Sequence, residues 1–470
     1  MKNYYSLVEI QEDLYDFKIS CCEIVSGYLK NISKNKSLNA FIEVYGEEAL
    51  DRAELLDRKI KNGSAGKLAG LVLGIKDNIC YKNHLSTAAS GILSGFRSTY
   101  SATVVERLLK EDAIIIGRLN CDEFAMGSSN ENSIYGPTYN PINNKYVPGG
   151  SSGASACSVK ANLCQVALGT DTGGSIRQPA AFCGVMGLKP TYGLVSRHGL
   201  IAYASSFDQI GPIAKSAEDI EVVMDIISGK DDFDSTCVGK NILSQKVPNN
   251  KTKKYAVLKE ALDFSGTHPA IKKQFGELIK RLKKNGHKIN YVNIPILEHL
   301  VPTYYILTTA EASSNLSRYD GIKYGRSNIK KPTKDIVSTT RSLGFGIEVK
   351  RRILLGTYVL SEGYYDAYYL KAQKIRRLIK LKTDQILEKN DYILLPTTPN
   401  APFKSGDKKI SPTQLYYEDV FTVQANLSGN PSISFPIGKI DKDFFASAQI
   451  IGKHFSERDL LNTTKHVVQY

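Results

Sequence analysis

The sequence predicts an α/β protein in which helices cover the faces of a β-sheet. Two observations support this fold class. Short apolar runs, such as 113–117 and 165–169, alternate with amphipathic segments such as 101–112. Residues 5–60, by contrast, place their apolar side chains at intervals of three and four. Such intervals are typical of amphipathic helices, whereas short runs that are apolar throughout are typical of strands buried on both faces.

The same patterns predict the individual elements. Residues 6–15 and 47–63 are expected to be helical, and the second helix runs into Gly63. The expected strands are 68–75, 113–117, 165–169, 255–260, 391–396 and 431–438. The long amphipathic stretch 348–390 is expected to pack one face against the sheet, with Gly356 and Gly363 as candidate breaks.

The domain organisation is expected to be simple. A chain of 470 residues would suffice for two or three average domains, but large α/β proteins of this length also occur as one unit. We expect an N-terminal helical segment, residues 1–65, packed on a single domain, residues 66–470, that carries the chemistry. The lysine-rich stretch 241–254 fits a surface loop better than a domain boundary.

Composition excludes several classes of protein. With 42% hydrophobic and 23% charged residues, the chain is typical of folded globular proteins and not of disordered ones. No apolar run approaches the roughly 18 to 20 residues that cross a bilayer, and the N-terminus carries acidic residues where a secretory signal would be apolar. We therefore expect a cytoplasmic protein without a membrane segment. The eight cysteines form no C-x-x-C pair, which predicts free buried thiols and no metal site.

The net charge of +14 has two interpretations. A basic chain is attracted to polyanions such as nucleic acid. Much of the excess, however, lies in lysine-rich stretches such as 374–382, which would equally form a solvated surface.

A strand, a glycine-rich turn and a helix are predicted in succession over residues 165–180. The turn GTDTGGS (169–175) places consecutive backbone amides near a helix N-terminus, where they can stabilise a developing negative charge. The amides of Thr172, Gly173, Gly174 and Ser175 would then form an oxyanion hole around the hydroxyl of Ser175. A plain tight turn or a phosphate-binding loop is the alternative, although the chain has no nucleotide P-loop because Leu68 stands where that motif needs a hydroxyl.

A second serine cluster, VPGGSSGASA (147–156), formally matches the G-x-S-x-G motif of α/β-hydrolases. That motif requires an apolar strand directly before it, and the residues that precede this cluster are polar. None of the seven histidines occupies an evident catalytic loop after the serines. Lys76 is the alternative base, because it ends a buried apolar run and burial lowers the pKa of an amine.

Three stretches together resemble the amidase signature family: GLVLGIKDNI (70–79), the serine cluster at 147–156 and GTDTGGSIRQPA (169–180). The resemblance implies the amidase signature fold, with a central mixed β-sheet covered by helices on both faces. It further implies that Ser175 is the nucleophile, that Ser151 is a bridging serine preceded by a cis peptide bond, and that Lys76 is the base. The sequence departs from the usual motif at Ala154, where the family has glycine, and at 446–449.

Longer stretches, such as 117–141 and 424–436, resemble one branch of that family, the glutamine-hydrolysing subunits of tRNA-dependent amidotransferases. The resemblance implies an enzyme that releases ammonia from glutamine through an acyl-enzyme. A partner subunit would then use the ammonia and ATP to convert Glu-tRNA(Gln) or Asp-tRNA(Asn) into Gln-tRNA(Gln) or Asn-tRNA(Asn). The assembly would be a cytoplasmic heterotrimer with two partner subunits, B and C, in which misacylated tRNA is reached mainly through the partner. This chain would bind no cofactor, since the partner subunit uses the ATP and Mg²⁺.

The resemblance also implies how glutamine is held. Arg352 would bind the α-carboxylate, Asp419 the α-ammonium group, and Tyr305 would complete the pocket; a register one residue earlier would use Arg351 and Tyr304 instead. Two other functions remain open: a stand-alone amidase of the same family acting on a small amide, and a non-catalytic scaffold in a tRNA-binding assembly. An amide without amino-acid charges would need neither Arg352 nor Asp419, and a scaffold would need none of the three catalytic residues.

Overall fold

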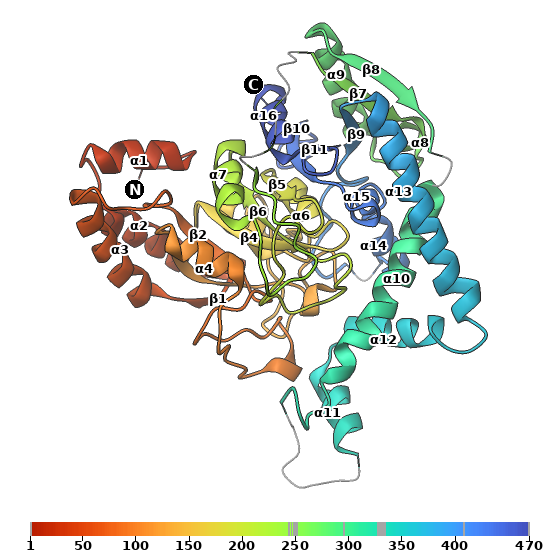
Figure 1. The fold of residues 1–470 in the computed structure, drawn as a ribbon, viewed down its shortest axis with the longest axis horizontal. Helices are drawn as coiled ribbons and strands as arrows, with labels where there is room; N and C mark the ends of the chain where they lie inside the picture. Colours follow the sequence, from red (N-terminus) through yellow and green to blue (C-terminus); the bar gives the residue numbers. More distant parts are fainter. Residues whose placement is uncertain are drawn as a thin grey trace.

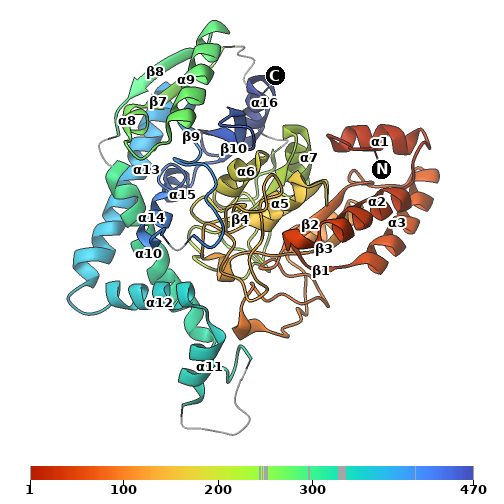
Figure 2. The same cartoon turned by 180° about the vertical axis from the view of Figure 1, so that it is seen from behind.

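One mixed β-sheet runs through the molecule (Figure 1 and Figure 2). The computed structural model describes residues 2–242, 245, 247, 252–294, 297–326, 335–407 and 409–468. Within these residues the strands are, in chain order, β1 (Phe41–Val44), β2 (Val72–Lys76), β3 (Ile114–Leu119), β4 (Val166–Asp171), β5 (Met186–Lys189), β6 (Gln209–Ala214), β7 (Lys254–Leu258), β8 (Lys288–Val292), β9 (Tyr392–Pro396), β10 (Ser432–Lys439) and β11 (Phe445–Ile451). Across the sheet their order is β1-β3-β2-β4-β6-β5-β10-β11-β9-β7-β8. Strand β2 is parallel to β3 and β4, and β7 is parallel to β8 and β9, whereas the other neighbours are antiparallel.

The helices surround this sheet. In chain order they are α1 (Leu7–Tyr15), α2 (Cys21–Lys34), α3 (Gly46–Lys61), α4 (Thr103–Lys110), α5 (Gly153–Lys160), α6 (Arg177–Cys183), α7 (Ala217–Ile227), α8 (Lys259–Asp263), α9 (Pro269–Lys284), α10 (Leu300–Asn315), α11 (Ile336–Gly344), α12 (Ile347–Val359), α13 (Lys371–Lys389), α14 (Pro412–Tyr417), α15 (Val423–Ser428) and α16 (Glu457–Val467). None of the helices described is both long enough and apolar enough to cross a membrane.

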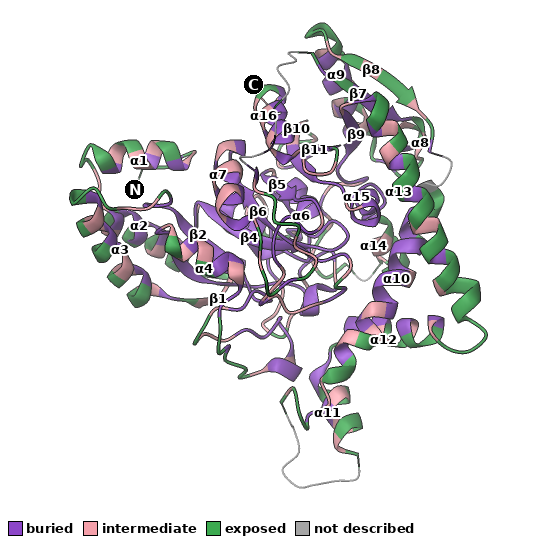
Figure 3. Ribbon diagram, viewed as in Figure 1, coloured by how far each residue is buried: buried purple, intermediate pink, exposed green. Residues whose placement is uncertain are grey.

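Alternate residues of the strands enter two separate hydrophobic cores. Tyr255 and Val257 of β7 belong to the first core, whereas Ala256 and Leu258 belong to the second. The first core includes buried residues of α1–α7, α9 and α16, and the second includes residues of α8, α10, α12, α13 and α15. Figure 3 shows the central strands buried and the outer faces of helices such as α13 exposed. The expected α/β sheet with helices on both faces is therefore confirmed.

The N-terminal segment contains the expected helices together with a strand that the periodicity did not predict. β1 pairs with β3, so residues 41–44 extend the sheet by one edge strand. Helix α2 begins with a capping box, in which the Ser20 hydroxyl accepts from the Glu23 amide and the Glu23 carboxylate accepts from the Ser20 amide. The Tyr28 hydroxyl of the same helix donates to Gln165 beside β4. These contacts join the segment to the sheet; the division at residue 65 remains a prediction.

The long amphipathic stretch at 348–390 is not one helix lying on the sheet. Helix α12 continues through Gly356 and does not break there. The glycine instead allows α12 to approach α10 closely, since a methyl group at this position would lie 1.9 Å from the Thr309 carbonyl oxygen. The chain turns at Gly363, with a φ of +80°, and a π-helical segment, Tyr365–Leu370, leads into α13. The expectation was wrong for α12, which packs against α10, and right for α13, which contacts β9.

Six strands were predicted from apolar runs, and all six are present. β1, β5, β6, β8 and β11 were not predicted as strands. β8 has no buried residue, and in β6 the residues Gly211 and Pro212 interrupt the apolar pattern although the strand itself is continuous. Half of the expected surface loop at 241–254 lies outside the described residues, and Lys254 is the first residue of β7.

Candidate active site

The predicted catalytic residues come from three neighbouring segments. Lys76 is the last residue of β2, Ser151 lies just before α5, and Ser175 lies in the turn between β4 and α6. Because β2 and β4 are adjacent parallel strands, their carboxyl ends bring Lys76 and the glycine-rich turn to the same edge of the sheet. The segment before Ser151 is a loop and not a strand, which agrees with the rejection of the α/β-hydrolase motif.

The amine of Lys76 is fully buried and surrounded by hydroxyl groups. Its Nζ lies 2.7 Å from the Oγ of Ser151, 3.0 Å from the Oγ of Ser152 and 2.8 Å from the Oγ1 of Thr170. Burial lowers the pKa of Lys76 to about 8, although distant acidic groups partly oppose this shift. The neutral fraction of this amine near pH 7 is therefore far larger than that of an exposed lysine.

A backbone hydrogen bond links the segment of Ser151 and Ser152 to the turn that carries Ser175. The amide of Ser152 donates to the carbonyl of Ser175 over 3.1 Å, and the peptide bond between Gly150 and Ser151 is cis. Ser175 is 8% exposed, whereas Ser151 is completely buried. No side-chain hydrogen bond of Ser175 to another described residue is present, so its hydroxyl is the open end of the cluster.

The glycines of the turn allow other residues to approach its backbone. A methyl group on Gly173 would lie 2.4 Å from the Cζ of Tyr304. Gly174 has a φ of +139°, which disfavours other residues, and a methyl group there would lie 2.4 Å from the Oγ1 of Thr422. The bare backbone is thus required by the close contacts with α10 and with the residues that precede α15.

The amides of the turn are not equivalent. The Gly174 amide donates to Asp171 Oδ1 over 2.8 Å, so it is already occupied. The amides of Thr172, Gly173 and Ser175 have no acceptor among the described residues. These three are the candidates for an oxyanion hole, which reduces the predicted set of four.

A buried ion pair between Arg177 and Asp171 holds the glycine turn in place. Arg177 donates from Nε to Asp171 Oδ2 over 3.0 Å, and both side chains are completely buried. Burial alone would raise the pKa of Asp171, but the Arg177 guanidinium and the hydrogen bond from Asn426 bring it down to about 2. Arg177 also donates to Gln449 Oε1 and to the Thr422 carbonyl. The turn is therefore anchored to α15 and β11, at the other end of the chain.

Residue Thr172 is held in a similar way. Its hydroxyl donates to Asp208 Oδ1 over 2.6 Å, and the other carboxylate oxygen accepts from the amides of Tyr203 and Ala204. Burial raises the pKa of Asp208 to about 6 despite these hydrogen bonds. The carboxylate positions the start of the turn without reaching the serines.

Arg352 lies buried among aromatic rings. Its Nε donates to Glu348 Oε1 over 2.8 Å, and its Nη1 donates to the Tyr203 hydroxyl over 3.0 Å. The guanidinium carbon lies 5.2 Å from the ring centre of Tyr305. The side chain of Arg351, by contrast, is 43% exposed, and Glu348 is its only ion-pair partner among the residues that the structure describes. The geometry thus favours Arg352 over Arg351 as the internal cation.

Asp419 lies in the same buried region. It accepts from the Ser128 hydroxyl over 3.2 Å and from the Tyr305 hydroxyl over 3.3 Å. Burial raises the pKa of Asp419 to about 7, and the positive charge of Arg352 limits that rise. The ring of Tyr304 packs against the ring of Tyr305 and lies close to Gly173. The two tyrosines therefore connect Asp419 to the glycine turn that carries Ser175. The structure therefore brings Arg352, Asp419 and Tyr305 together beside Ser175.

Several residues of the site were missed by the motifs. Ser152 and Thr170 contact Lys76; Asp171, Arg177 and Asp208 hold the turn; and Glu348, Tyr203, Tyr416 and Ser128 surround the charged pair. Ser152, Thr170, Asp171 and Arg177 lie inside or next to the quoted motifs, so their polar character within buried stretches was an available signal. The others come from distant segments and carry no local signal.

The departures from the family motif are accommodated. Ala154 lies buried in the first turn of α5, where its amide donates to Asn130 Oδ1 over 2.9 Å. Residues 446–449 form part of β11, and Gln449 also accepts from Arg177. All eight cysteines carry free thiols, as expected, although Cys22 and Cys237 are only partly buried.

A buried amine, two serines and a glycine turn lie together at the edge of the mixed sheet, and these are the groups that a serine-dependent amide hydrolase would need. A family model described as Amidase matches residues 23–461, and the chain belongs to this family. It is similar to the A subunit of glutamyl-tRNA(Gln) amidotransferase from Legionella pneumophila (strain Paris), at 46% identity over 99% of this chain and 97% of the relative. The A subunit numbered 2 of the same enzyme from Clostridium acetobutylicum is also 46% identical, over 97% of each chain. The crystal structure of the A subunit from Thermotoga maritima is 39% identical, with a TM-score of 0.78 over 96% of this chain and 92% of that one.

Proposed function

We propose that this chain is the glutamine-hydrolysing subunit of a tRNA-dependent amidotransferase, which is a carbon–nitrogen ligase with glutamine as amide donor. The observation that carries this proposal is that Arg352 and Asp419 are buried close together beside the glycine turn of Ser175. Glutamine has a carboxylate, an ammonium group and an amide, and this site offers a partner to each. The names of the relatives, which are A subunits of glutamyl-tRNA(Gln) amidotransferase, support the same function.

The hydrogen bonds around Lys76 indicate the direction of proton transfer. The Ser152 hydroxyl donates to the Thr170 carbonyl, so towards Lys76 it can only accept. A neutral amine has two N–H groups, which match Ser152 and Thr170, and one lone pair. That lone pair is left to accept the proton of Ser151 at 2.7 Å. Lys76 is therefore arranged to deprotonate Ser151 and not Ser152, whose proton is directed to the Thr170 carbonyl.

Acylation follows from this arrangement. Ser175 Oγ attacks the amide carbon of glutamine while its proton passes to Ser151 Oγ, and the proton of Ser151 passes to Lys76. The amides of Thr172, Gly173 and Ser175 stabilise the oxyanion as it forms. The proton then returns by the same route to the leaving nitrogen, which releases ammonia and leaves a γ-glutamyl ester on Ser175. Water, deprotonated by the same chain of groups, hydrolyses the ester to glutamate.

Recognition of the amino-acid end uses the two buried charges. Arg352 binds the α-carboxylate and Asp419 the α-ammonium group, while the Tyr305 hydroxyl orients Asp419. A charged hydrogen bond of this kind contributes roughly 1.5 to 3 kcal/mol. The ammonium group of the substrate would also favour the ionised form of Asp419, whose pKa is otherwise raised by burial.

The ammonia would serve partner subunits in a cytoplasmic assembly. In this proposal the assembly is a heterotrimer with two partners, B and C, and the B partner uses ATP and Mg²⁺ to amidate Glu-tRNA(Gln), Asp-tRNA(Asn) or both. Misacylated tRNA is reached mainly through that partner. Serine and lysine chemistry requires no cofactor, so none is assigned to this chain.

Ammonia release from glutamine by the purified chain tests the proposal. The assay is run with the chain alone and then with the partner subunits, ATP and misacylated tRNA, and Ser175→Ala serves as the inactive control. Stimulation by the full mixture, with amidated aminoacyl-tRNA as product, is the expected result. Turnover of a simple amide by the chain alone, with no glutamine hydrolysis in any mixture, would instead assign a stand-alone amidase.

A further inference from the structure

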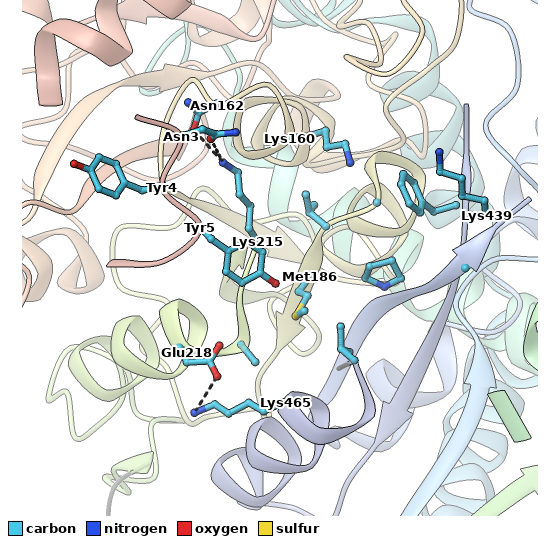
Figure 4. Close-up of a pocket in the computed structure, with 17 residues that line it drawn as sticks. Asn3, Tyr4, Tyr5, Lys160, Asn162, Met186, Lys215, Glu218, Lys439 and Lys465 are labelled. Carbon is cyan, nitrogen blue, oxygen red and sulfur yellow. Dashed lines mark hydrogen bonds and ion pairs between the residues drawn. The ribbon is translucent and has the colours of Figure 1, made fainter. Parts of the chain in front are cut away.

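A second cavity, of about 930 Å³, lies outside the serine site. Its walls come from the N-terminal residues, the turn between α6 and β5, the start of α7, the hairpin of β10 and β11, and α16. Figure 4 shows Lys160 and Lys439 on one side of it and Tyr5, Lys215 and Lys465 on the other. Pockets of roughly 300 to 1,000 Å³ are typical of sites for small molecules.

This cavity is separated from the serines by the lengths of two helices. Helix α5 begins directly after Ser151 and Ser152 and ends at Lys160, which lines the cavity. Helix α6 begins after Ser175 and ends before Gly184, which also lines it. Since α5 has 8 residues, its ends are about 12 Å apart. The cavity is thus a distinct site at the opposite ends of the helices that follow the serines.

The charges of the cavity are unbalanced within the described residues. Lys465 is paired, with its Nζ 2.6 Å from Glu221 and 3.8 Å from Glu218. The other three lysines, Lys160, Lys215 and Lys439, form no ion pair with any described carboxylate. Lys215 donates only to neutral amide oxygens, those of Asn3 and Asn162, over 3.2 and 3.0 Å.

The two lysines on the opposite wall share one aromatic ring. The Nζ atoms of Lys160 and Lys439 lie 4.7 and 5.9 Å from the ring centre of Phe445. Burial lowers the pKa of Lys160, and the positive charge of Lys439 lowers it further. Burial also lowers the pKa of Lys215. Lys160 and Lys215 are therefore partly desolvated and Lys439 is exposed beside them, while the carboxylate of the lining, Glu218, lies near Lys465. A bound anion would stabilise the three lysines that have no carboxylate partner among the described residues.

The lining suits an anion that also carries an aromatic group. All its cationic side chains are lysines, which bind phosphate groups as point charges. The remaining wall is largely apolar, with Met186 buried and the ring of Tyr5 half exposed. An exposed aromatic ring beside an apolar wall suits a stacked base.

We propose that this cavity binds a nucleoside phosphate, with the phosphate groups held by Lys160, Lys215 and Lys439 and the base packed on Tyr5 and Met186. The assignment does not depend on the proposed function, because none of these residues belongs to the serine site.

Calorimetric titration of the full chain at low ionic strength tests the site with ADP, pyrophosphate and adenosine as probes. ADP and pyrophosphate are expected to bind, and adenosine, which lacks phosphate, is expected to bind at least about tenfold more weakly than ADP. Failure of both ADP and pyrophosphate to bind, or tighter binding of a glutamate-rich peptide than of either, would overturn the proposal.

Two sets of variants locate the binding. Lys160→Gln combined with Lys439→Gln is expected to weaken ADP at least about tenfold, and Lys442→Gln, at an exposed position of the same hairpin, is expected to change nothing. Tyr5→Ala is expected to weaken ADP but not pyrophosphate, since only the base contacts that ring. The double variant removes one partly buried charge, that of Lys160, and one exposed charge, that of Lys439, so its melting temperature should not fall. Measuring the melting temperature checks that the variant folds. Equal ADP binding by the wild type and the double variant would place the nucleotide elsewhere.

Discussion

Lys76 can act as a base because its surroundings remove the hydration that normally stabilises an ammonium group. Its amine is fully buried and contacts three hydroxyl groups, and no carboxylate contacts it among the described residues. Hydroxyl groups hold the amine in place but compensate its charge far less than a carboxylate would. A single side chain thus acquires a pKa of about 8 through burial, without a histidine in the site.

The pH dependence of glutamine hydrolysis should report this group. Lys76 must be neutral to accept a proton, so kcat/KM is expected to rise about tenfold per pH unit below the pKa of about 8 and to level off above it. Initial rates of ammonia release between pH 6 and 9.5 give the profile. In Lys76→Ala the rate should fall by roughly 10³-fold or more, whereas Lys82→Ala, at an exposed position, should behave like the wild type. A profile that is flat between pH 6 and 8 would exclude Lys76 as the base.

Arg352 and Arg351 offer a matched pair of substitutions, one buried and one exposed. Arg352→Ala is expected to raise KM for glutamine by roughly 10- to 100-fold, since one charged contact to the carboxylate is lost. Arg351→Ala should change KM less than about threefold, as expected for an exposed charge. Steady-state kinetics with glutamine, and with an amide that lacks a carboxylate, give the comparison. Equal loss with both substrates would show that Arg352 maintains the fold of the pocket and does not bind glutamine.

At the scale of the element, the glycine turn and the helices around it restrain one another. Tyr304 of α10 occupies the space above Gly173, and Thr422, just before α15, occupies the space beside Gly174. Thr422 also donates to the Gly173 carbonyl over 2.6 Å. The direction of the free amides is therefore set by elements far away in the chain as well as by the turn itself.

Gly173→Ala tests this packing, and Gly276→Ala serves as its control. The new methyl group at 173 would overlap Tyr304, which is only 3% exposed and cannot swing away. We expect a loss of about 1 to 3 kcal/mol in the free energy of unfolding and a fall of at least about tenfold in kcat as the amides shift. Gly276 lies within α9 with open space around it, so alanine there should stabilise by about 0.5 to 1 kcal/mol. Chemical denaturation and glutaminase assays measure both effects; unchanged kcat in Gly173→Ala would remove the turn from the oxyanion hole.

The whole molecule is held together by buried polar groups as well as by its two hydrophobic cores. Arg177 donates to Asp171, Asn426 and Gln449, which belong to β4, α15 and β11. These bonds span more than half of the sequence and cross the centre of the sheet. Lys189, at the end of β5, is a contrasting case, because its ammonium group is buried and, among the described residues, donates to the Pro190 carbonyl alone.

Lys189→Met should therefore stabilise the protein. Burial lowers the pKa of Lys189 to about 7, helped by the charge of Arg177, so the folded state binds its proton more weakly than the unfolded state. The penalty is fully present below pH 7 and disappears as the pH rises towards the ordinary lysine pKa. We expect a gain of about 2 kcal/mol at pH 7 that shrinks towards zero near pH 10. Denaturation curves at both pH values measure it, with Lys442→Met as the exposed control; a gain independent of pH would assign the effect to packing alone.

The sequence by itself placed Lys76 and Ser175 at strand ends, because the signal for each position is local; their catalytic roles are what the family resemblance predicts. Lys76 ends an apolar run, and Ser175 follows another within a few residues, so strand periodicity and the glycine turn place both at strand ends. The class of fold was predictable for the same reason, since a buried strand requires apolar residues at every position. The geometry of these segments agrees with the resemblance to the amidase signature family.

Only the tertiary structure decided which distant residues complete the site. The choice of Arg352 over Arg351 depends on which side of α12 faces α10, and Glu348, Tyr203 and Asp208 reach the pocket from separate elements. Such contacts carry no local signal, because any single polar residue on an amphipathic helix would be expected to face solvent. The lysine cavity is an equally tertiary feature: Lys160 and Lys439 lie 279 residues apart and meet only where α5 ends beside the β10–β11 hairpin.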